Sequence, residues 1–326
     1  MAVFTAITPG EAREILARYQ LGDFISLRGI AAGIENTNYF LETSTGAWVL
    51  TVFERLSFSE LPFYLELMRH LAARGLPVPQ PQASRTGELM IEFRGKPLAI
   101  VPRLPGRDIS TPTAHQCALV GEVLARMHLA AADFPLFQPN LRGIGWWKDT
   151  APRLESFLPE ETFELLADEV VFQDSFTRSA TFDALPKGAV HADLFRDNAL
   201  IENPGAADER VGGVIDFYFA GCTAWLFDLA VTMNDWCIDP ASGRFDAERS
   251  QAMIEAYHAV RPLTDVERES WRSALRAAAL RFWISRLFDL HLPRAAELLT
   301  PKDPAHFERI LLLRRTTREL PWPAAA

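Results

Sequence analysis

The strongest constraint on this chain is a run of eight residues near its middle, His191-Ala192-Asp193-Leu194-Phe195-Arg196-Asp197-Asn198. A later apolar stretch, Val211 to Ile215, ends in Asp216-Phe217. Each polar residue is ordinary by itself, because aspartate and asparagine are common in loops and at strand ends. At this spacing, and after a segment rich in strands, they together predict one site that is built from a loop and a strand end.

The residue types at these positions suit phosphoryl transfer to a hydroxyl group. This reaction needs an aligned hydroxyl and cations that stabilise the developing phosphate charge, and it needs little covalent help. We expect Asp193 to accept the hydroxyl proton, with Asn198 and Asp216 as oxygen ligands of Mg2+. His191 completes the catalytic pattern and is expected to brace the loop by hydrogen bonding, whereas Asp197 is expected to be structural. The pattern matches the catalytic loop and the metal-binding aspartate of kinases.

Composition limits the class of partner. The chain has 326 residues, 48% of them hydrophobic, which is ordinary for a globular protein of about two domains. The net charge of −9 leaves no basic surface for nucleic acid or anionic lipid, so we expect a small-molecule partner. No apolar stretch is long enough to span a membrane, and the first ten residues do not resemble a signal peptide. Three scattered cysteines without metal spacing favour a cytoplasmic location, and the oligomeric state stays open.

The expected elements place strands before helices. A capping box at Thr8-Pro9-Gly10-Glu11 predicts a helix that ends before Gly22. β-Branched and aromatic residues predict strands over 24–27, 38–41 and 48–53, and a hairpin over 89–101. Helical spacing predicts helices over 61–73, 113–131, 160–177, 247–260, 264–290 and 304–320, with a β-rich island over 189–219.

This order predicts an α+β protein with a bilobal, protein-kinase-like fold. Residues 1–103 are expected to form a small lobe with an antiparallel β-sheet that binds the nucleotide. Residues 104–326 are expected to form a larger, mainly helical lobe that holds the catalytic loop and the substrate. The hinge between them is expected near Val101 to Arg107, where Pro102 to Gly106 break the chain.

The lobe order and the motifs resemble the aminoglycoside phosphotransferase and choline kinase group, which shares the protein-kinase fold. The segment Leu124-Ala125-Arg126-Met127-His128 is similar to the helix that precedes the catalytic loop in that group. More closely, the chain resembles the homoserine kinases of this fold, and the resemblance covers nearly its whole length. It rests on Gly33 to Tyr39, Leu61 to Leu65, His191 to Phe195 and Ile215 to Ala220.

The resemblance implies ATP and Mg2+ as cofactors and L-homoserine as the substrate. The product would be O-phospho-L-homoserine, an intermediate of threonine biosynthesis. The resemblance also implies that Asp193 is the catalytic base and that Asn198 and Asp216 hold the metal.

The nucleotide is expected to contact two segments of the first lobe. Backbone and side-chain donors of the first segment would hold the phosphates, and they include Gly33, Asn36, Thr37 and Asn38. The second segment lies at the hinge, where the resemblance implies that adenine binds beside Ile100, Val101, Arg103 and Leu104.

One departure from the kinase pattern concerns the phosphate-binding lysine of the third strand. Thr51 stands at that position, and no lysine precedes Lys96. Arg28 or Arg55 is a candidate substitute, because a guanidinium binds phosphate well. The glutamate that normally pairs with the lysine is expected to be Glu66 rather than Glu60.

The amino-acid end of the substrate needs a cation for its carboxylate and an anion for its ammonium group. Arg281 and Arg286 are candidates for the carboxylate, because an arginine fork matches it bidentately. Asp235 is the candidate for the ammonium group, and Tyr218 is expected to line the pocket. For each of these residues, an internal ion pair or a place in the core is the competing interpretation.

Two other functions remain open at this point. One is a phosphotransferase of the same fold that acts on an aminoglycoside, choline or methylthioribose. The other is a nucleotide-binding regulator without phosphoryl transfer, which the missing lysine favours. The intact set of Asp193, Asn198 and Asp216 argues against the regulator, because an inactive protein has no chemical need for all three.

Overall fold

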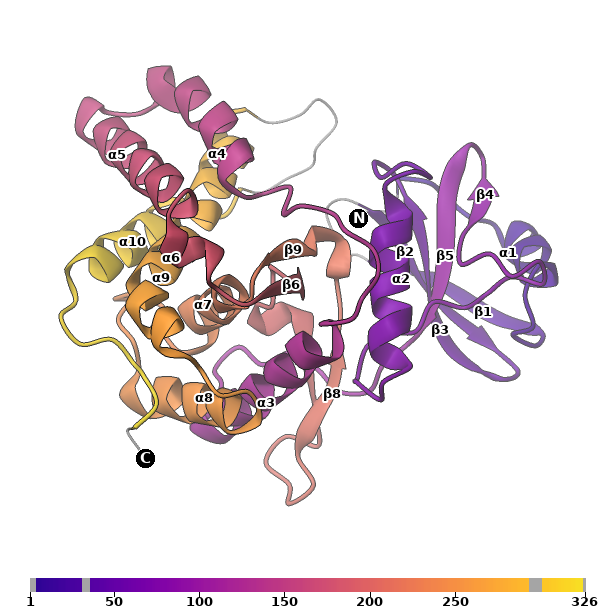
Figure 1. Ribbon diagram of the computed structural model, residues 1–326. Helices are drawn as coiled ribbons and strands as arrows, with labels where there is room; N and C mark the ends of the chain where they lie inside the picture. The colour runs from indigo at the N-terminus through magenta and orange to yellow at the C-terminus, as the bar shows by residue number, and fades with distance from the viewer. Residues whose placement is uncertain (1–3, 31–35, 293–300, 325–326) are drawn as a thin grey trace. The chain divides into compact units, whose positions relative to one another are not determined.

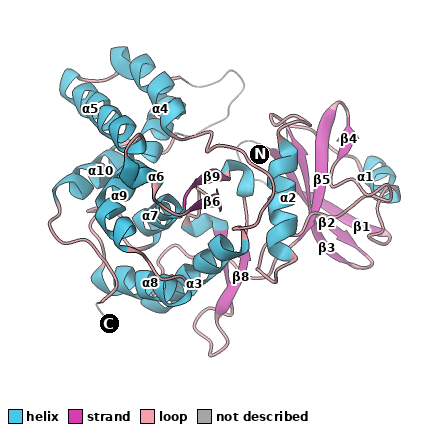
Figure 2. Ribbon diagram, viewed as in Figure 1, coloured by secondary structure: helices cyan, strands magenta, loops and turns pink. Residues whose placement is uncertain are grey.

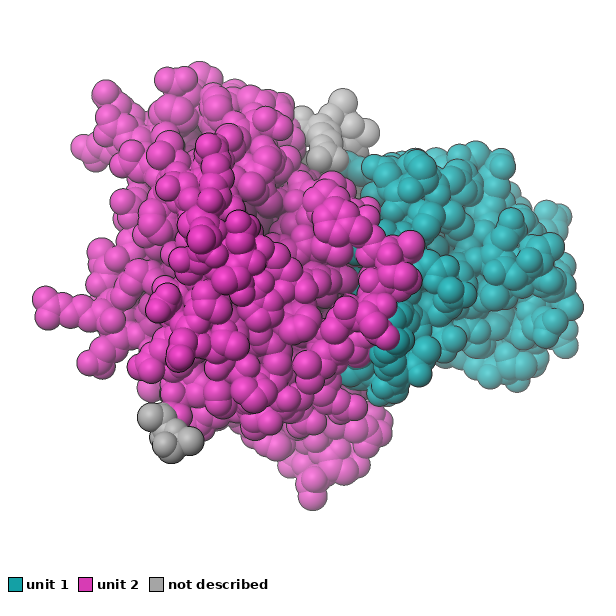
Figure 3. All heavy atoms as spheres, in the orientation of Figure 1, with its two compact units in different colours: residues 1–105, 297–299 teal, residues 106–296, 300–326 magenta. Residues whose placement is uncertain are grey.

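The computed structural model describes residues 4–30, 36–292 and 301–324 (Figure 1). Its strands gather mainly in the N-terminal part of the chain and its helices in the rest (Figure 2). The described residues up to Pro105 form one compact unit, and those from Gly106 onward form a second (Figure 3). The predicted α+β class, with an antiparallel sheet ahead of a mainly helical segment, is confirmed.

The first unit is built on an antiparallel sheet with the strand order β1-β2-β3-β5-β4. Helix α1 (Pro9–Ala17) begins at Thr8, whose capping box with Glu11 is present as predicted. In Figure 1 the strands lie between α1 and α2 (Leu61–Ala72). The strands are β1 (Phe24–Gly29), β2 (Asn36–Thr43), β3 (Gly46–Phe53), β4 (Ile91–Phe93) and β5 (Lys96–Pro102).

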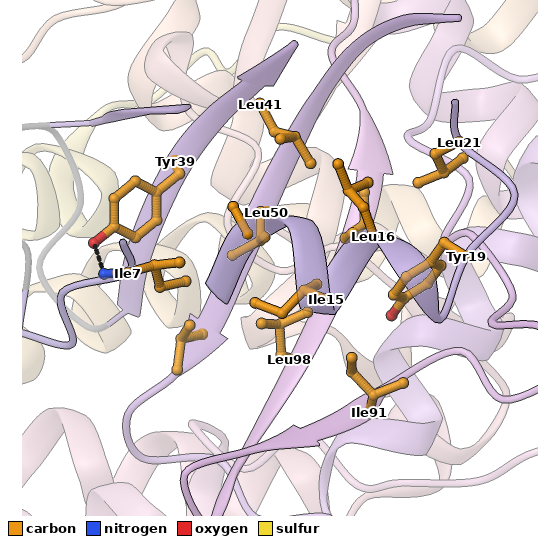
Figure 4. Close-up of a cluster of buried hydrophobic side chains, with 13 residues drawn as sticks. Ile7, Ile15, Leu16, Tyr19, Leu21, Tyr39, Leu41, Leu50, Ile91 and Leu98 are labelled. Atoms are coloured by element: carbon orange, nitrogen blue, oxygen red, sulfur yellow. Dashed lines mark hydrogen bonds between the residues drawn. The ribbon is translucent and has the colours of Figure 1, made fainter. Parts of the chain in front are cut away.

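Alternation along the strands gives this sheet two different faces. One face carries the apolar core beneath α1, in which Leu41, Leu50 and Ile100 are fully buried (Figure 4). Neighbours in each strand point to the opposite face, which therefore presents Asn38, Phe40, Thr51 and Val101. This second face is the more polar one, and it contains the position where kinases carry their lysine.

The second unit contains most of the predicted helices, which are α3 (Ala114–Ala130), α5 (Glu160–Thr177), α8 (Ala247–Val260), α9 (Asp265–His291) and α10 (Ala305–Thr316). Helix α10 ends four residues before the predicted Leu320, because Thr317 is extended and its backbone leaves the helix. Short helices α4 (Ile144–Thr150) and α6 (Ala180–Asp183) were not predicted. Within the described part of the chain, no helix is both long and apolar enough to cross a membrane.

Helix α7 (Trp225–Trp236) was missed by the sequence prediction for a physical reason. All of its residues from Leu226 to Trp236 are buried, so its polar positions do not repeat with the helical period. The β-rich region before it forms two separate two-stranded sheets. Strand β6 (Lys187–Val190) pairs with β9 (Gly221–Ala224), and β7 (Ala199–Glu202) pairs with β8 (Arg210–Val214), both antiparallel.

Two tyrosines of the α1 core give a matched test of hydrogen bonding in the first unit (Figure 4). The Tyr39 hydroxyl accepts a hydrogen bond from the Ile7 amide at 3.0 Å and donates one to the Thr5 carbonyl at 3.0 Å. The Tyr19 hydroxyl is buried and has no hydrogen-bond partner among the described residues.

Tyr39→Phe should therefore lower the free energy of unfolding by about 1–3 kcal/mol, because it leaves two buried backbone groups without a partner. Tyr19→Phe should leave it unchanged within about 0.5 kcal/mol or raise it. Urea denaturation of the two variants and the parent measures both values. Equal losses of unfolding free energy in the two variants would contradict the difference in hydrogen bonding between the Tyr39 and Tyr19 hydroxyls.

Candidate active site

The loop that follows β6 is fixed to the end of β8 by His191. The His191 Nε2–H donates to the Ile215 carbonyl at 2.9 Å, and its Nδ1 accepts from the Asp193 amide at 3.2 Å. The imidazole ring also packs on Phe217, with ring centroids 4.6 Å apart. His191 therefore joins the two sequence motifs directly, although 24 residues separate it from Ile215.

Strand register brings Asn198 and Asp216 to the same place. Ala199 pairs with Val214, and the Ile215 amide donates to the Asn198 carbonyl at 2.9 Å, so Asn198 lies opposite Ile215, the residue just before Asp216. The Asn198 Nδ2 donates to the Asp193 carbonyl at 2.8 Å and to its Oδ2 at 3.3 Å. The amide nitrogen of Asn198 is therefore engaged by Asp193, both by its carbonyl and by its carboxylate.

The backbone of Asp216 is strained. Its φ of 63° and ψ of 62° place it in the left-handed region, which costs a non-glycine residue about 1 kcal/mol or more. Strain of this kind persists only where neighbouring contacts enforce it, and here the short 3₁₀ turn η3 (Phe217–Phe219) follows at once. The contacts that enforce this conformation hold the Asp216 carboxylate at the end of β8, next to the catalytic loop.

Burial raises the pKa of Asp193 to about 7, while the nearby Arg281 acts in the opposite direction and Asp216 adds to the rise. The Arg281 Nη2 lies 3.7 Å from Asp193 Oδ1. The Asp193 side chain retains 15% exposure, so it is enclosed and still reachable. A carboxylate with this pKa is a stronger base than an aspartate in water, and it remains ionised at slightly alkaline pH.

The residue that organises this loop, Asp228 of α7, was not found by the sequence reasoning. Its Oδ2 accepts the His191 amide at 3.0 Å and its Oδ1 accepts the Ala192 amide at 2.7 Å. Ala192 has a φ of 62°, so a non-glycine residue is held in the left-handed region at the sharpest point of the loop. Burial acts to raise the pKa of Asp228, but hydrogen bonds led by that from His128 outweigh it and the pKa is lowered.

His128 of α3 supports Asp228 from the other side. Its Nε2 lies 3.0 Å from Asp228 Oδ2 and its Nδ1 lies 2.7 Å from the Tyr257 hydroxyl. Because a carboxylate only accepts, we assign the proton to Nε2, and Nδ1 then accepts from Tyr257. The ring stacks on Trp225 with an interplanar angle of 7°. Burial lowers the pKa of His128, which keeps the imidazole neutral at neutral pH.

A family model described as the phosphotransferase enzyme family matches residues 26–263. The chain belongs to the phosphotransferase enzyme family. Homoserine kinase of Paraburkholderia xenovorans strain LB400 is 54% identical over 324 residues, which cover 98% of each chain. Homoserine kinase of Ralstonia nicotianae is 54% identical over 316 residues, or 95% of each chain.

Solved structures support the same fold. Amicoumacin kinase has a TM-score of 0.69 at 16% identity, over 95% of this chain and 98% of that one. Spectinomycin phosphotransferase has a TM-score of 0.69 at 13% identity, over 97% of this chain and 100% of that one. At these identities the likeness concerns the fold alone.

In this phosphotransferase, two of the residues predicted to bind substrate are engaged elsewhere. Asp235 accepts from the Arg196 backbone amide at 2.8 Å and from both sides of its guanidinium, Nε at 3.0 Å and Nη2 at 3.2 Å. The Arg286 Nη1 donates to the Asp303 carbonyl at 2.8 Å, and its guanidinium lies over Phe307. These contacts match the competing interpretation of internal pairing. Tyr218 is half-buried, and burial raises its pKa.

The predicted nucleotide-binding residues divide between the two faces of the sheet. Gly33 lies outside the described residues. Asn36 and Asn38 lie on the polar face, where the Thr51 hydroxyl donates to Asn38 Oδ1 at 2.8 Å. The Thr37 side chain points to the α1 face, where its hydroxyl donates to Glu54 at 2.6 Å and accepts the amides of Phe4 and Thr5.

The hinge residues divide in the same way. The Ile100 side chain is fully buried in the α1 core, and its carbonyl accepts a hydrogen bond from the Gln82 amide at 2.8 Å. Val101 and Arg103 belong to the polar face, and the Arg103 guanidinium lies over the Phe40 ring with its carbon 4.4 Å from the centroid. Leu104 is half-buried just after β5.

The charged residues near β3 do not reproduce the usual lysine and glutamate pair. Lys96 pairs with Glu54 and donates to the Thr5 hydroxyl on the α1 face. It therefore does not take the place of the phosphate-binding lysine of kinases, whose position on β3 is occupied here by Thr51. Arg28 lies over Phe40 with 5.3 Å between its guanidinium carbon and the ring centroid. Glu66 pairs with Arg69 within α2.

His128→Gln should change how stability depends on pH. The pKa of His128 is lowered in the folded state, so below about pH 6.5 the unfolded chain binds the extra proton and the free energy of unfolding falls. One such group contributes a slope of at most about 1.4 kcal/mol per pH unit in that window. The variant should show a shallower fall between pH 7.5 and 5.5 than the parent, measured by urea denaturation, with its value at pH 8 as baseline. Identical slopes would show that His128 is not kept neutral.

Proposed function

We propose that this chain is a homoserine kinase. It transfers the γ-phosphoryl group of ATP to the side-chain hydroxyl of L-homoserine and forms O-phospho-L-homoserine and ADP, a step of threonine biosynthesis. The observation that carries the proposal is the identity of more than half of all residues to homoserine kinases over almost the full length of both chains. The catalytic loop with Asp193, Asn198 and Asp216 supplies the groups that this reaction requires.

Asp193 accepts the proton of the substrate hydroxyl as that oxygen attacks the γ-phosphorus. Its carboxylate is oriented by the Asn198 Nδ2, and its loop is held by Asp228. The raised pKa of about 7 makes the carboxylate a better proton acceptor than an exposed aspartate. The enclosed position also excludes most of the water that would compete with the substrate hydroxyl.

Asp216 and Asn198 would hold Mg2+, which neutralises charge on the phosphates when it is bound. The two residues offer one carboxylate and one amide oxygen, which suit a hard cation. Among the described residues, no group of three or more His, Cys, Asp or Glu side chains is arranged to hold a metal ion by itself. This fits an ion that takes its remaining ligands from water and the nucleotide phosphates, as Mg2+ commonly does.

The polar face of the sheet supplies the nucleotide contacts in this proposal. Asn36 and Asn38 direct amide groups toward the phosphates, with Thr51 orienting Asn38. Val101, Arg103 and Leu104 lie beside the adenine. Thr37 keeps a structural role beneath α1, because its hydroxyl is already engaged.

Coupled ADP release with ATP and Mg2+ tests the substrate. L-Homoserine should give turnover, while L-serine, L-threonine, choline, methylthioribose and kanamycin should give less than about a hundredth of its kcat/KM. Turnover with another of these alcohols, and not with homoserine, would assign a different substrate to the same site. ATP binding without any turnover would favour the nucleotide-binding regulator.

Asp193→Asn should lower kcat for homoserine by about 10²- to 10⁴-fold, because the positioned proton acceptor is lost, while ATP still binds. Asp197→Asn is the matched control in the same loop. Asp197 is 61% exposed and pairs only loosely with Lys302 at 3.7 Å, so its replacement should change kcat less than about threefold. Similar losses of kcat in the two variants would contradict the assignment of Asp193 as the base and Asp197 as a structural residue.

A further inference from the structure

A buried arginine lies beside the catalytic base. Arg281 is on α9, is 4% exposed, and places its Nη2 3.7 Å from Asp193 Oδ1. Its guanidinium lies over two aromatic rings, with its carbon 4.9 Å from the Phe219 centroid and 3.9 Å from that of Phe282. Its Nη1 donates to the Ser285 hydroxyl at 3.4 Å. The rings fix the plane of the fork next to the place where the substrate hydroxyl must bind.

The Arg281–Asp193 contact differs from other buried arginine pairs of the same unit. Arg276 closes on Glu169 with Nη2 at 2.6 Å and Nε at 2.9 Å, and Arg196 closes on Asp235 with both sides of its fork. At 3.7 Å, the Arg281 contact exceeds the 2.7–2.9 Å that is typical of a charge-assisted hydrogen bond. Arg281 is thus held near the base without forming a closed pair with it.

We propose that Arg281 binds the carboxylate of the amino-acid substrate, an assignment that rests on the proposed function. It makes this site specific for hydroxy amino acids over amino alcohols. An arginine fork is the residue type that matches a carboxylate bidentately, and burial among aromatic rings strengthens the interaction. Arg281 is preferred for its position, because its fork lies beside Asp193, whereas Arg286 donates to the Asp303 carbonyl and Asp235 accepts from Arg196.

The short distance between base and fork suits a short substrate. In L-homoserine the hydroxyl oxygen and the carboxylate carbon are separated by four bonds, which span about 5 Å when extended. The substrate hydroxyl would then lie about 2.7 Å from Asp193 and the substrate carboxylate about 2.8 Å from Arg281. One homoserine molecule can make both contacts because the two side chains are only 3.7 Å apart. Substrate binding replaces the loose contact with two short ones.

The test compares L-homoserine with 3-amino-1-propanol, which is the same molecule without the carboxylate. The variants are Arg281→Met, Arg281→Lys and, as a matched control, Arg142→Met. Arg142 also lies over Phe219, with its guanidinium carbon 5.9 Å from the ring centroid, and over Trp146 at 4.5 Å. For each enzyme, kcat and KM are measured for both alcohols, and an inhibition constant against L-homoserine is measured for 3-amino-1-propanol.

Arg281→Met should lower kcat/KM for L-homoserine at least about thirtyfold, mostly through KM, because a buried carboxylate loses its charged partner. The constants for 3-amino-1-propanol should change less than about threefold in the same variant. The kcat/KM of Arg281→Lys for L-homoserine should lie between those of the parent and of Arg281→Met, because lysine keeps the positive charge but lacks the guanidinium fork. Arg142→Met should leave the preference for homoserine intact.

Three outcomes would overturn the assignment. Equal losses for both alcohols would mean that Arg281 acts on Asp193 and not on the carboxylate. An unchanged KM for L-homoserine would remove Arg281 from the substrate site, and a selective loss in Arg142→Met would move the carboxylate to that residue. If Arg281→Met does not fold, the same comparison on Arg281→Lys decides. Failure of the parent enzyme to phosphorylate homoserine would contradict the proposed function, which is a distinct result.

Discussion

The Asp228 carboxylate holds the catalytic loop in a shape that the loop would not adopt by itself. Two backbone amides, those of His191 and Ala192, donate to it, and Ala192 is in a left-handed conformation that a non-glycine residue ordinarily avoids. A buried carboxylate needs such partners, since removing one member of a buried charged network costs about 3–5 kcal/mol. The loop geometry and the charge of Asp228 therefore sustain each other, and His128 closes the arrangement from α3.

Electrostatics at the site follow from this fixed backbone. The loop brings Asp193 close to Asp216. Two like charges repel each other, so both carboxylates are stable in the ionised form only when cations lie nearby. Burial adds to the cost of ionising Asp193, while Arg281 reduces it. The site thus has an excess of negative charge that a divalent cation would compensate, and the Arg281 guanidinium lies 3.7 Å from the Asp193 carboxylate.

The sequence was informative where function depends on short-range geometry. The spacing from His191 to Asn198 and the following strand end were enough to place Asp193, Asn198 and Asp216 near one another, because β7 and β8 pair and the Asn198 side chain bonds to Asp193. It was less informative where the answer depends on distant contacts. The pairing of Asp235 with Arg196 spans 39 residues, and the role of Asp228 requires a helix whose buried surface hides its period.

Strand alternation explains the remaining difference. Asn36, Thr37 and Asn38 looked equivalent as donors for phosphate, but in a strand the middle one must point to the other face. Thr37 accordingly joins Glu54 and Lys96 beneath α1, and the same alternation sends the Ile100 side chain into the core.

The alternation also bears on the missing lysine. Since Lys96 lies on the α1 face and Thr51 bonds to Asn38, the polar face offers neutral amides and hydroxyls at the position where kinases offer an ammonium group. On the same face, the guanidinium groups of Arg28 and Arg103 both lie over the Phe40 ring, which is two residues along β2 from Asn38. Under the proposed function, neutral donors on this face would give less charge compensation than a lysine, and a metal held by Asn198 and Asp216 would have to balance more of the phosphate charge.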